Sequence, residues 1–344
     1  VRHNAGLFDI SHMGLITLKG DATEIAAALD KLSPQRIGSL AEGKAVYTQF
    51  LNDQGGVIDD LIIYKLSENI TQSYAPCPYW TNETSHLIIC NASNRDVILA
   101  WLKQHLSSDI EINLASTHYG LLALQGPKAK EILASLGIAE LPKRFWIQPA
   151  QIDSHPVLLS RTGYTGEDGV EIIVPNVFIS EVWDKLLTAG KSFDILPCGL
   201  AARDTLRMEA AYPLYGQEFD ENITPLEAGL AWSVVVDKEV PYIGQAALQR
   251  QKANGLNRQT LCLTLTAQAI PRHGFKVFYQ GTEIGIVTSG GISPSLNCPI
   301  AIVLCQNNDE KILQNLSPGV TVQVEIRNKF IDATIVERPF YKRG

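Results

Sequence analysis

The sequence predicts an α+β protein that carries a separate all-β module at its C-terminal end. Two observations predict this division. Up to residue 255, segments with strand-like character alternate with segments whose apolar residues recur at helical spacing. Beyond that point, short β-like runs are punctuated by glycine and proline, and no run shows convincing helical periodicity. We therefore predict an α+β region over residues 1–255 and a small barrel or sandwich over residues 256–344.

The first region is expected to open with a strand, a capped helix and a hairpin. Residues 14–20 form the predicted strand, and Asp21 is the predicted cap of a helix over residues 22–31. The runs 45–51 and 57–66 read as strands joined by a glycine-containing turn, which is typical of a hairpin. Further expected elements are strands at 87–90 and 120–125 and helices at 95–106, 128–136 and 178–187.

The C-terminal module shows only β-like runs. They occupy residues 259–265, 276–279, 282–288, 299–304 and 320–337. No helix is expected among them, and the boundary with the first region is placed within residues 252–257.

Composition excludes two classes of protein. Hydrophobic residues make up 45% of the chain and charged residues 19%, as in an ordinary globular protein. No apolar run reaches the roughly 18 residues that predict a membrane span. The net charge of −7 and the lack of a Lys/Arg cluster argue against a nucleic-acid partner.

The cysteine pattern predicts neither a disulfide framework nor a metal site. The six cysteines are dispersed and show no C-x-x-C or Cys/His ligand spacing; they are Cys77, Cys90, Cys198, Cys262, Cys298 and Cys305. We expect them to be reduced and largely buried, in a reducing compartment such as the cytoplasm.

A glycine-rich loop at 161–171 is the most unusual stretch of the chain. Its sequence, RTGYTGEDGVE, holds three glycines among threonines, a tyrosine, an arginine and carboxylates, between two apolar runs. Glycine lets the backbone approach a ligand closely, because it has no Cβ and tolerates positive φ. Taken alone, the loop fits a hairpin turn as well as it fits a ligand-binding segment.

Two adjacent carboxylates begin the apolar strand predicted after residue 56. Because neighbours on a strand point to opposite faces, Asp60, Ile62 and Tyr64 share one face, and Asp59 lies on the other. A carboxylate at the start of a buried strand is a candidate for orienting or deprotonating a substrate nitrogen. A carboxylate that only satisfies backbone N–H groups of the turn is the alternative for this segment.

Residues 199–212 read as a helix with two arginines four residues apart. Arg203 and Arg207 repel each other unless acids or an anionic ligand lie between them. Ion pairing within the chain is one explanation, and Asp204 is a candidate partner of Arg207. An arginine clamp on the carboxylate of a ligand is the other, because guanidinium binds carboxylate bidentately.

The acids that follow this helix do not match a metal-binding template. Glu218, Asp220 and Glu221 have no known loop spacing, so no metal is expected. The chain also lacks the G-x-S-x-G, P-loop and G-x-G-x-x-G motifs. What remains is cofactor-free chemistry on a bound small molecule.

Taken together, these segments resemble one family, the T-proteins of glycine cleavage systems, which are aminomethyltransferases. The matching motifs span almost the whole chain in the family's order. They are residues 6–14, 55–64, 122–129, 161–171, 199–209, 215–232, 242–244, 270–274, 288–290, 293–294 and 339–341.

The resemblance implies a cloverleaf of two ferredoxin-like α+β domains and a C-terminal β-barrel around a central folate cavity. It also implies the reaction: the one-carbon unit on the aminomethyl-lipoyl arm of a partner, the H-protein, passes to tetrahydrofolate. The products are 5,10-methylenetetrahydrofolate, ammonia and the dihydrolipoyl arm. No metal, nucleic acid or membrane is implied, and the compartment is the cytoplasm, or the mitochondrial matrix in a eukaryote.

The resemblance carries residue roles to matching positions. Asp60 matches the key catalytic carboxylate beside the reactive folate nitrogen. Glu171 is expected to accept hydrogen bonds from the aminopyrimidine edge of a pterin, and Arg203 to face the glutamate tail or a carboxylate within the site. The full set of expected folate-binding residues is Met13, Tyr47, Ile62, Tyr64, Asn91, Tyr164, Glu171, Arg203, Tyr212 and Tyr341.

Two departures and two rivals accompany the resemblance. Family members usually carry further residues ahead of the segment matching Val1, which implies an incomplete N-terminus, and the excursion at 73–85 is longer than usual. One rival is a folate-dependent demethylase or the folate domain of a sarcosine or dimethylglycine dehydrogenase. The other is a folate-binding iron–sulfur maintenance protein, whose Lys-Gly-Cys-Tyr type of motif has no counterpart at residues 202–209.

Overall fold

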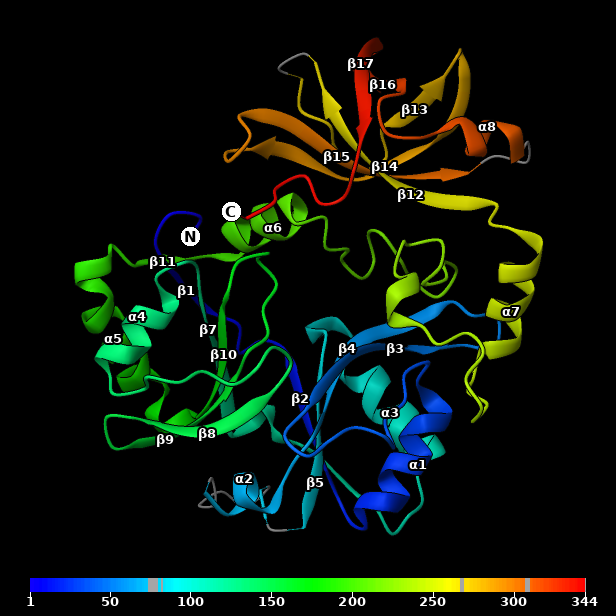
Figure 1. Cartoon of the computed structure of the whole chain (residues 1–344). Helices are drawn as coiled ribbons and strands as arrows, with labels where there is room; N and C mark the ends of the chain where they lie inside the picture. The colour runs from blue at the N-terminus through cyan, green and yellow to red at the C-terminus, as the bar shows by residue number, and fades with distance from the viewer. Residues whose placement is uncertain (74–79, 82, 267–268, 307–309, 344) are drawn as a thin grey trace.

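The computed structural model describes residues 1–73, 80–81, 83–266, 269–306 and 310–343. Two α+β lobes lie side by side, and a β-barrel lies across one end of both (Figure 1). The first lobe holds a five-stranded sheet and the second a six-stranded sheet. This is the predicted fold class, α+β with a C-terminal barrel.

The five-stranded sheet is antiparallel throughout and has helices on one face. Its order is β3-β4-β5-β2-β6. The strands are β2 (Gly14–Lys19), β3 (Ala45–Leu51), β4 (Val57–Lys65), β5 (Thr84–Cys90) and β6 (Glu111–Leu114). The helices are α1 (Ala22–Leu32) and α3 (Arg95–His105), whose apolar sides pack into one core with the sheet. The predicted cap of α1 is confirmed, because Asp21 accepts hydrogen bonds from the backbone N–H groups of Thr23 and Glu24.

The six-stranded sheet runs in the order β11-β1-β7-β10-β9-β8. Its strands are β1 (Gly6–Asp9), β7 (Tyr119–Gln125), β8 (Ile147–Ile152), β9 (His155–Ser160), β10 (Gly169–Pro175) and β11 (Leu196–Cys198). Only the short edge pair β1 and β11 is parallel. Helices α4 (Ala129–Ser135) and α5 (Ile179–Gly190) pack with the sheet in a second core.

The C-terminal module is a closed six-stranded barrel in the order β12-β15-β14-β13-β16-β17. Its strands are β12 (Arg258–Leu265), β13 (Lys276–Tyr279), β14 (Thr282–Ser293), β15 (Cys298–Gln306), β16 (Thr321–Ile326) and β17 (Lys329–Val336). In the described part of the module, each strand therefore pairs with a neighbour on both sides. Of the two architectures that the sequence allowed, the barrel is therefore the one formed, and the exact boundary at residue 255 stays a prediction.

Four further helices are short. They are α2 (Glu68–Ser73), α6 (Leu200–Glu209), α7 (Gln245–Asn254) and α8 (Glu310–Asn315). The expectation of a C-terminal module without helix is wrong at α8, a helix of six residues that is too short to show a repeated helical pattern of apolar residues. The predicted run 320–337 is two strands, because Arg327 and Asn328 adopt positive φ and turn the chain back on itself.

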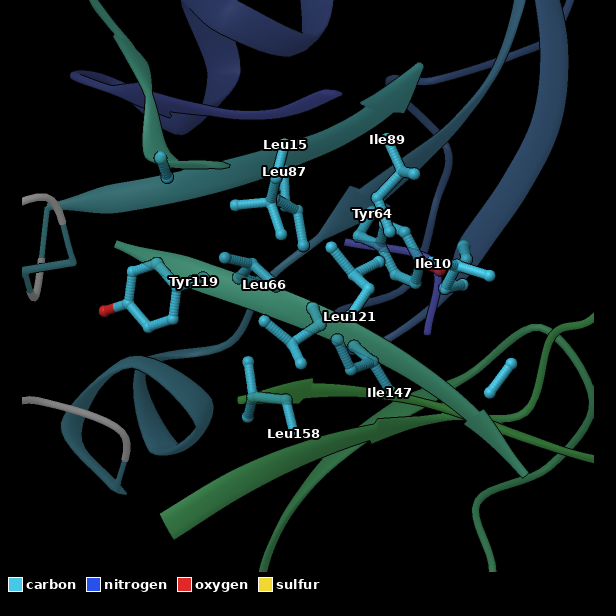
Figure 2. Close-up of a cluster of buried hydrophobic side chains, with 14 of the residues drawn as sticks. Ile10, Leu15, Tyr64, Leu66, Leu87, Ile89, Tyr119, Leu121, Ile147 and Leu158 are labelled. Carbon is cyan, nitrogen blue, oxygen red and sulfur yellow. The ribbon is translucent and has the colours of Figure 1, made fainter. Parts of the chain in front are cut away.

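The inner faces of the two sheets pack against each other and form the central core. Leu15, Leu87 and Ile89 come from the first sheet, and Leu121 and Leu158 from the second. Figure 2 shows these side chains gathered between the strands. Complete burial of one such side chain contributes about 1.5–3 kcal/mol, so this contact fixes how the two sheets face each other.

Buried charges tie the barrel to the helix beneath it. Glu209, at the end of α6, accepts hydrogen bonds from Ser293 Oγ (2.6 Å) and Ser295 Oγ (2.8 Å) of the barrel module. Arg207 donates to Ser289 Oγ at 2.8 Å. Figure 1 shows α6 lying directly below the barrel. These contacts hold one wall of the cavity described next.

Candidate active site

A cavity of about 770 Å³ opens where the two lobes and the tail of the barrel meet. This volume lies within the usual range of small-molecule sites, roughly 300–1,000 Å³. Side chains from both sheets, from α6, from the irregular segment after α6 and from residues 338–343 line it. The site therefore depends on segments that are far apart in the sequence.

The cavity gathers almost every residue that the sequence singled out. Its wall includes Asp60 together with Met13, Tyr47, Ile62, Asn91, Tyr164, Glu171, Arg203, Tyr212 and Tyr341. Tyr64 is not part of the wall. It is fully buried in the core between the sheets, where its hydroxyl lies 3.0 Å from Ser160 Oγ. The predicted alternation of side chains along β4 is correct, but Tyr64 lies farther along this strand than the part that lines the cavity.

Asp60 is held by two hydrogen-bond donors. Tyr47 donates its hydroxyl to Asp60 Oδ2 at 3.0 Å, and Asn91 donates Nδ2–H to Asp60 Oδ1 at 2.6 Å. Burial raises the pKa of Asp60, while these two hydrogen bonds and the charge of Arg203 act in the opposite direction. The carboxyl group therefore has a fixed orientation and a pKa above that of an exposed aspartate.

The hairpin register explains why these groups meet. Tyr47 lies opposite Ile62 in the β3–β4 pair, and Gln49 lies opposite Asp60. Tyr47 is therefore a diagonal neighbour of Asp60 on the same face of the sheet. Asn91 directly follows β5, whose last residue pairs with Leu61.

Glu171 lines the site from the other sheet, on β10. Thr162 Oγ1 donates to Glu171 Oε2 at 2.5 Å and also lies 2.9 Å from Ser160 Oγ. Burial raises the pKa of Glu171, and the Thr162 hydroxyl and the charge of Arg203 oppose this change. Within the described residues, no side chain donates a hydrogen bond to the second carboxyl oxygen, which leaves that oxygen available to a ligand.

The glycine-rich loop contributes to the wall and is fastened by its own ion pair. Arg161 binds Asp168 through Nη2 (2.6 Å) and Nε (3.0 Å), so this arginine closes the loop. Gly163 lies so close to Gln125 that a Cβ would be 2.1 Å from its side-chain oxygen. The glycine is needed for this close packing, which brings Tyr164 into the cavity wall.

The two arginines of α6 have different partners. Arg207 is buried and forms ion pairs with Glu218 (3.0 Å) and Asp204 (2.8 Å). Arg203 is part of the cavity wall and lies over the ring of Tyr164, 4.5 Å from its centroid. Pairing within the chain thus explains Arg207, while Arg203 remains a candidate for binding an anionic ligand.

Some residues of the cavity wall were not predicted. Trp232 stacks on Tyr47 at 5.4 Å between ring centroids and is 67% exposed. The tail adds Arg338, Lys342 and Arg343. The sequence offered one signal for Trp232, its place at the end of the motif 215–232, but no spacing rule links it to Tyr47.

Other predictions concern metals, membranes and cysteines. Among the described residues, no group of three or more His, Cys, Asp or Glu side chains could hold a metal ion, and no helix is long and apolar enough to cross a membrane. The described cysteines carry no disulfide: Cys90, Cys262 and Cys305 are buried, and Cys198 and Cys298 are half-buried. Cys77 lies outside the described residues.

Comparison with known proteins gives one consistent result. Residues 1–75 and 77–238 match the family model described as GCVT N-terminal domain. Residues 258–342 match the glycine cleavage T-protein C-terminal barrel domain. Relatives named aminomethyltransferase are 41% identical in Bacillus subtilis, covering 100% of this chain and 89% of the relative, and 42% identical in Listeria monocytogenes serotype 4b, covering 100% and 88%.

A solved structure agrees with the family matches. The glycine cleavage system aminomethyltransferase T from Bartonella henselae aligns with a TM-score of 0.84 and 32% identity, over 99% of this chain and 88% of that one. Fold and sequence therefore define an aminomethyltransferase, an enzyme that transfers a one-carbon unit. More specifically, the chain belongs to the glycine cleavage T-protein family.

Proposed function

We propose that the cavity binds tetrahydrofolate and that the enzyme transfers to it the one-carbon unit of an aminomethyl-lipoyl arm carried by H-protein. The observation that carries this proposal is the placement of two carboxylates, the half-buried Asp60 and the buried Glu171, in the wall of one cavity, from facing sheets. Asp60 can hold the reacting nitrogen while Glu171 recognises the pterin ring.

Asp60 is the proposed catalytic residue. In the transfer, two folate N–H bonds are replaced by bonds to the methylene carbon, which loses its bonds to nitrogen and sulfur. The two protons leave with ammonia and with the dihydrolipoyl sulfur. The Asp60 carboxylate, oriented by Tyr47 and Asn91, would accept a hydrogen bond from the attacking amine and position its lone pair.

Glu171 is the proposed recognition residue for the pterin. A carboxylate accepts two parallel hydrogen bonds from the amino group and ring N–H of an aminopyrimidine edge. Thr162 holds one of its oxygens, which fixes the orientation of the carboxylate plane. Tyr164 and Tyr212, whose rings stack at 5.8 Å between centroids, offer flat surfaces beside it.

The remaining wall residues are assigned to the rest of the folate. Met13 and Ile62 supply apolar contact, and Arg203 supplies a positive charge for the glutamate tail or another carboxylate. Tyr341 closes the site from the barrel side, where Arg2 lies over its ring at 4.1 Å from the centroid. A positive charge inside an otherwise acidic protein favours the entry of an acidic ligand.

The proposed partner is a lipoylated H-protein, and the proposed compartment is the cytoplasm. The family supports both, and the chemistry supports the partner, because the one-carbon unit must arrive on a carrier long enough to enter the cavity. The free, largely buried cysteines are consistent with a reducing compartment.

One assay tests the proposal. The enzyme is mixed with aminomethylated H-protein and tetrahydrofolate, and ammonia and methylenetetrahydrofolate are measured, with reactions lacking either partner as controls. We expect equal amounts of the two products, formed only in the complete mixture. Binding of tetrahydrofolate without release of ammonia would instead make the protein a folate binder.

A further inference from the structure

Asp59, the neighbour of the proposed catalytic residue, is buried on the other face of the same strand. It is 0% exposed and is not part of the cavity wall. Its carboxyl group accepts three N–H hydrogen bonds: from Asn91 N (3.0 Å), from Asn91 Nδ2 (2.8 Å) and from Asn94 Nδ2 (2.8 Å). A carboxylate with this many donors, all from one short segment, holds that segment in place.

The segment in question carries the donor that binds Asp60. Asn91 Nδ2 lies 2.8 Å from Asp59 Oδ1 and 2.6 Å from Asp60 Oδ1, so a single amide group bridges the two carboxyls. The Asn91 side chain has only one amino group, and both of its N–H bonds are engaged in this way. If the amide rotated by half a turn, its oxygen would face two carboxyl groups, which is unfavourable.

We propose that Asp59 is a positioning residue that acts on Asp60 through Asn91. Its buried carboxyl group fixes the Asn91 backbone and the orientation of the Asn91 amide, and the amide in turn orients the carboxylate that faces the substrate. This inference rests on the proposed function, because it assigns Asp59 a part in the reaction carried out at Asp60.

The free-energy cost of burying the Asp59 carboxyl group supports a role beyond packing. Burial and the nearby charge of Asp60 raise the pKa of Asp59 to about 7, against the effect of the Asn91 and Asn94 hydrogen bonds. Its position on β4 lies on the apolar side that packs against α1 and α3, with Leu61 and Ile63. An apolar residue would fit that side without this cost, but it would leave the donors of Asn91 and Asn94 unsatisfied.

Substitution of Asp59 tests the proposal. In Asp59→Ala we expect kcat to fall about 10- to 100-fold, because a small misplacement of a catalytic group has effects of this size. The Kd for tetrahydrofolate should change less than threefold, since Glu171 and Arg203 are untouched. Asp59→Asn keeps one acceptor oxygen for the Asn91 amide and should recover part of the lost kcat. Asp53→Asn, in the exposed turn of the same hairpin, is the matched control and should behave as wild type.

A double-substitution cycle separates positioning from general damage. On an Asp60→Asn background, Asp59→Asn should lower kcat no further, because its effect passes through Asp60. An equal loss of kcat on both backgrounds would overturn the proposal, as would a kcat within twofold of wild type in both Asp59 variants. If Asp59→Ala does not fold, Asp59→Asn and the cycle still decide.

The outcomes also distinguish this inference from the proposed function. If the wild-type enzyme releases no ammonia in the complete mixture, the proposed function fails. If the wild type is active and depends on Asp60, and Asp59 proves dispensable, only the role of Asp59 is wrong.

Discussion

The cavity wall carries two carboxylates in different hydrogen-bond settings, and we call the parts of the wall around them the Asp60 end and the Glu171 end. Asp60 is half-buried and Glu171 is buried, both have a raised pKa, and they lie on strands of facing sheets. Each carboxyl oxygen of Asp60 accepts a hydrogen bond, one from Tyr47 and the other from Asn91. The carboxyl group of Asp59 lies on the other face of the same strand. Glu171 has one hydroxyl donor, Thr162, on one of its oxygens, so both oxygens keep lone pairs for a ligand.

This difference assigns the reaction to Asp60 and the recognition of the ligand to Glu171. A carboxylate fixed through both oxygens is held in one orientation, which suits the precise placement of a reacting nitrogen. A carboxylate with an available oxygen suits binding, because the ligand completes its hydrogen bonds. Changes at the Asp60 end should therefore alter kcat, and changes at the Glu171 end should alter affinity. The following predictions test that separation, from the largest expected effect to the smallest.

Asp60→Asn should lower kcat by about 100-fold or more, the scale of effect expected when a proton-accepting group is lost. The Kd for tetrahydrofolate should stay within about threefold of wild type, because the asparagine keeps the shape of the side chain. Steady-state release of ammonia and a binding titration measure the two quantities. Turnover at the wild-type rate would show that the reaction does not depend on this carboxylate.

Glu171→Gln should raise the Kd for tetrahydrofolate by about 10- to 100-fold. The loss corresponds to about 1.5–3 kcal/mol, the contribution of hydrogen bonds to a charged group. At saturating folate, kcat should remain within a few fold of wild type. Quenching of tryptophan fluorescence gives the Kd, since Trp232 belongs to the cavity wall. A loss confined to kcat would contradict the separation of the two ends.

Thr162→Val should raise the same Kd by about 2- to 10-fold, because it removes one hydrogen bond that orients Glu171. Thr162→Ser keeps the hydroxyl group and is the matched control. The comparison is made by titration with tetrahydrofolate. Equal affinity in the valine and serine variants would mean that this hydroxyl does not orient the carboxylate.

Tyr47→Phe should change the pH dependence of the reaction more than its maximal rate. The Tyr47 hydrogen bond lowers the pKa of Asp60, so its loss raises that pKa and the ionised form appears only at higher pH. The acidic limb of kcat/KM should move upward by about 0.5–1 pH unit. A limb that stays in place, or moves to lower pH, would show that another group controls it.

Local patterns made much of the fold predictable. Strand alternation placed Asp60 and Ile62 on one face and Asp59 on the other, and the structure has this arrangement. The capping of α1 by Asp21 was also readable from a few neighbouring residues. Such features depend on spacings of two to four residues, which a sequence displays directly.

Long-range contacts were not predictable from the residues alone. The sequence left open whether Arg203 and Arg207 pair within the chain or bind an anionic ligand; the structure pairs Arg207 with Glu218 and Asp204 and leaves Arg203 in the cavity wall. Tyr64 has the right face but lies too deep along its strand. These outcomes depend on how two sheets and a barrel come together, and no local pattern encodes that geometry. The resemblance to a family supplied it for most of the expected folate-binding residues.

A crystal structure of the enzyme with tetrahydrofolate tests the central claim most directly. The account predicts that the aminopyrimidine edge binds the Glu171 carboxylate and that the reacting nitrogen lies within hydrogen-bond reach of Asp60, about 2.6–3.2 Å. The glutamate tail should extend toward Arg203. A folate bound with its pterin edge on Asp60, or bound outside the cavity, would contradict the assignment of chemistry to one end and recognition to the other.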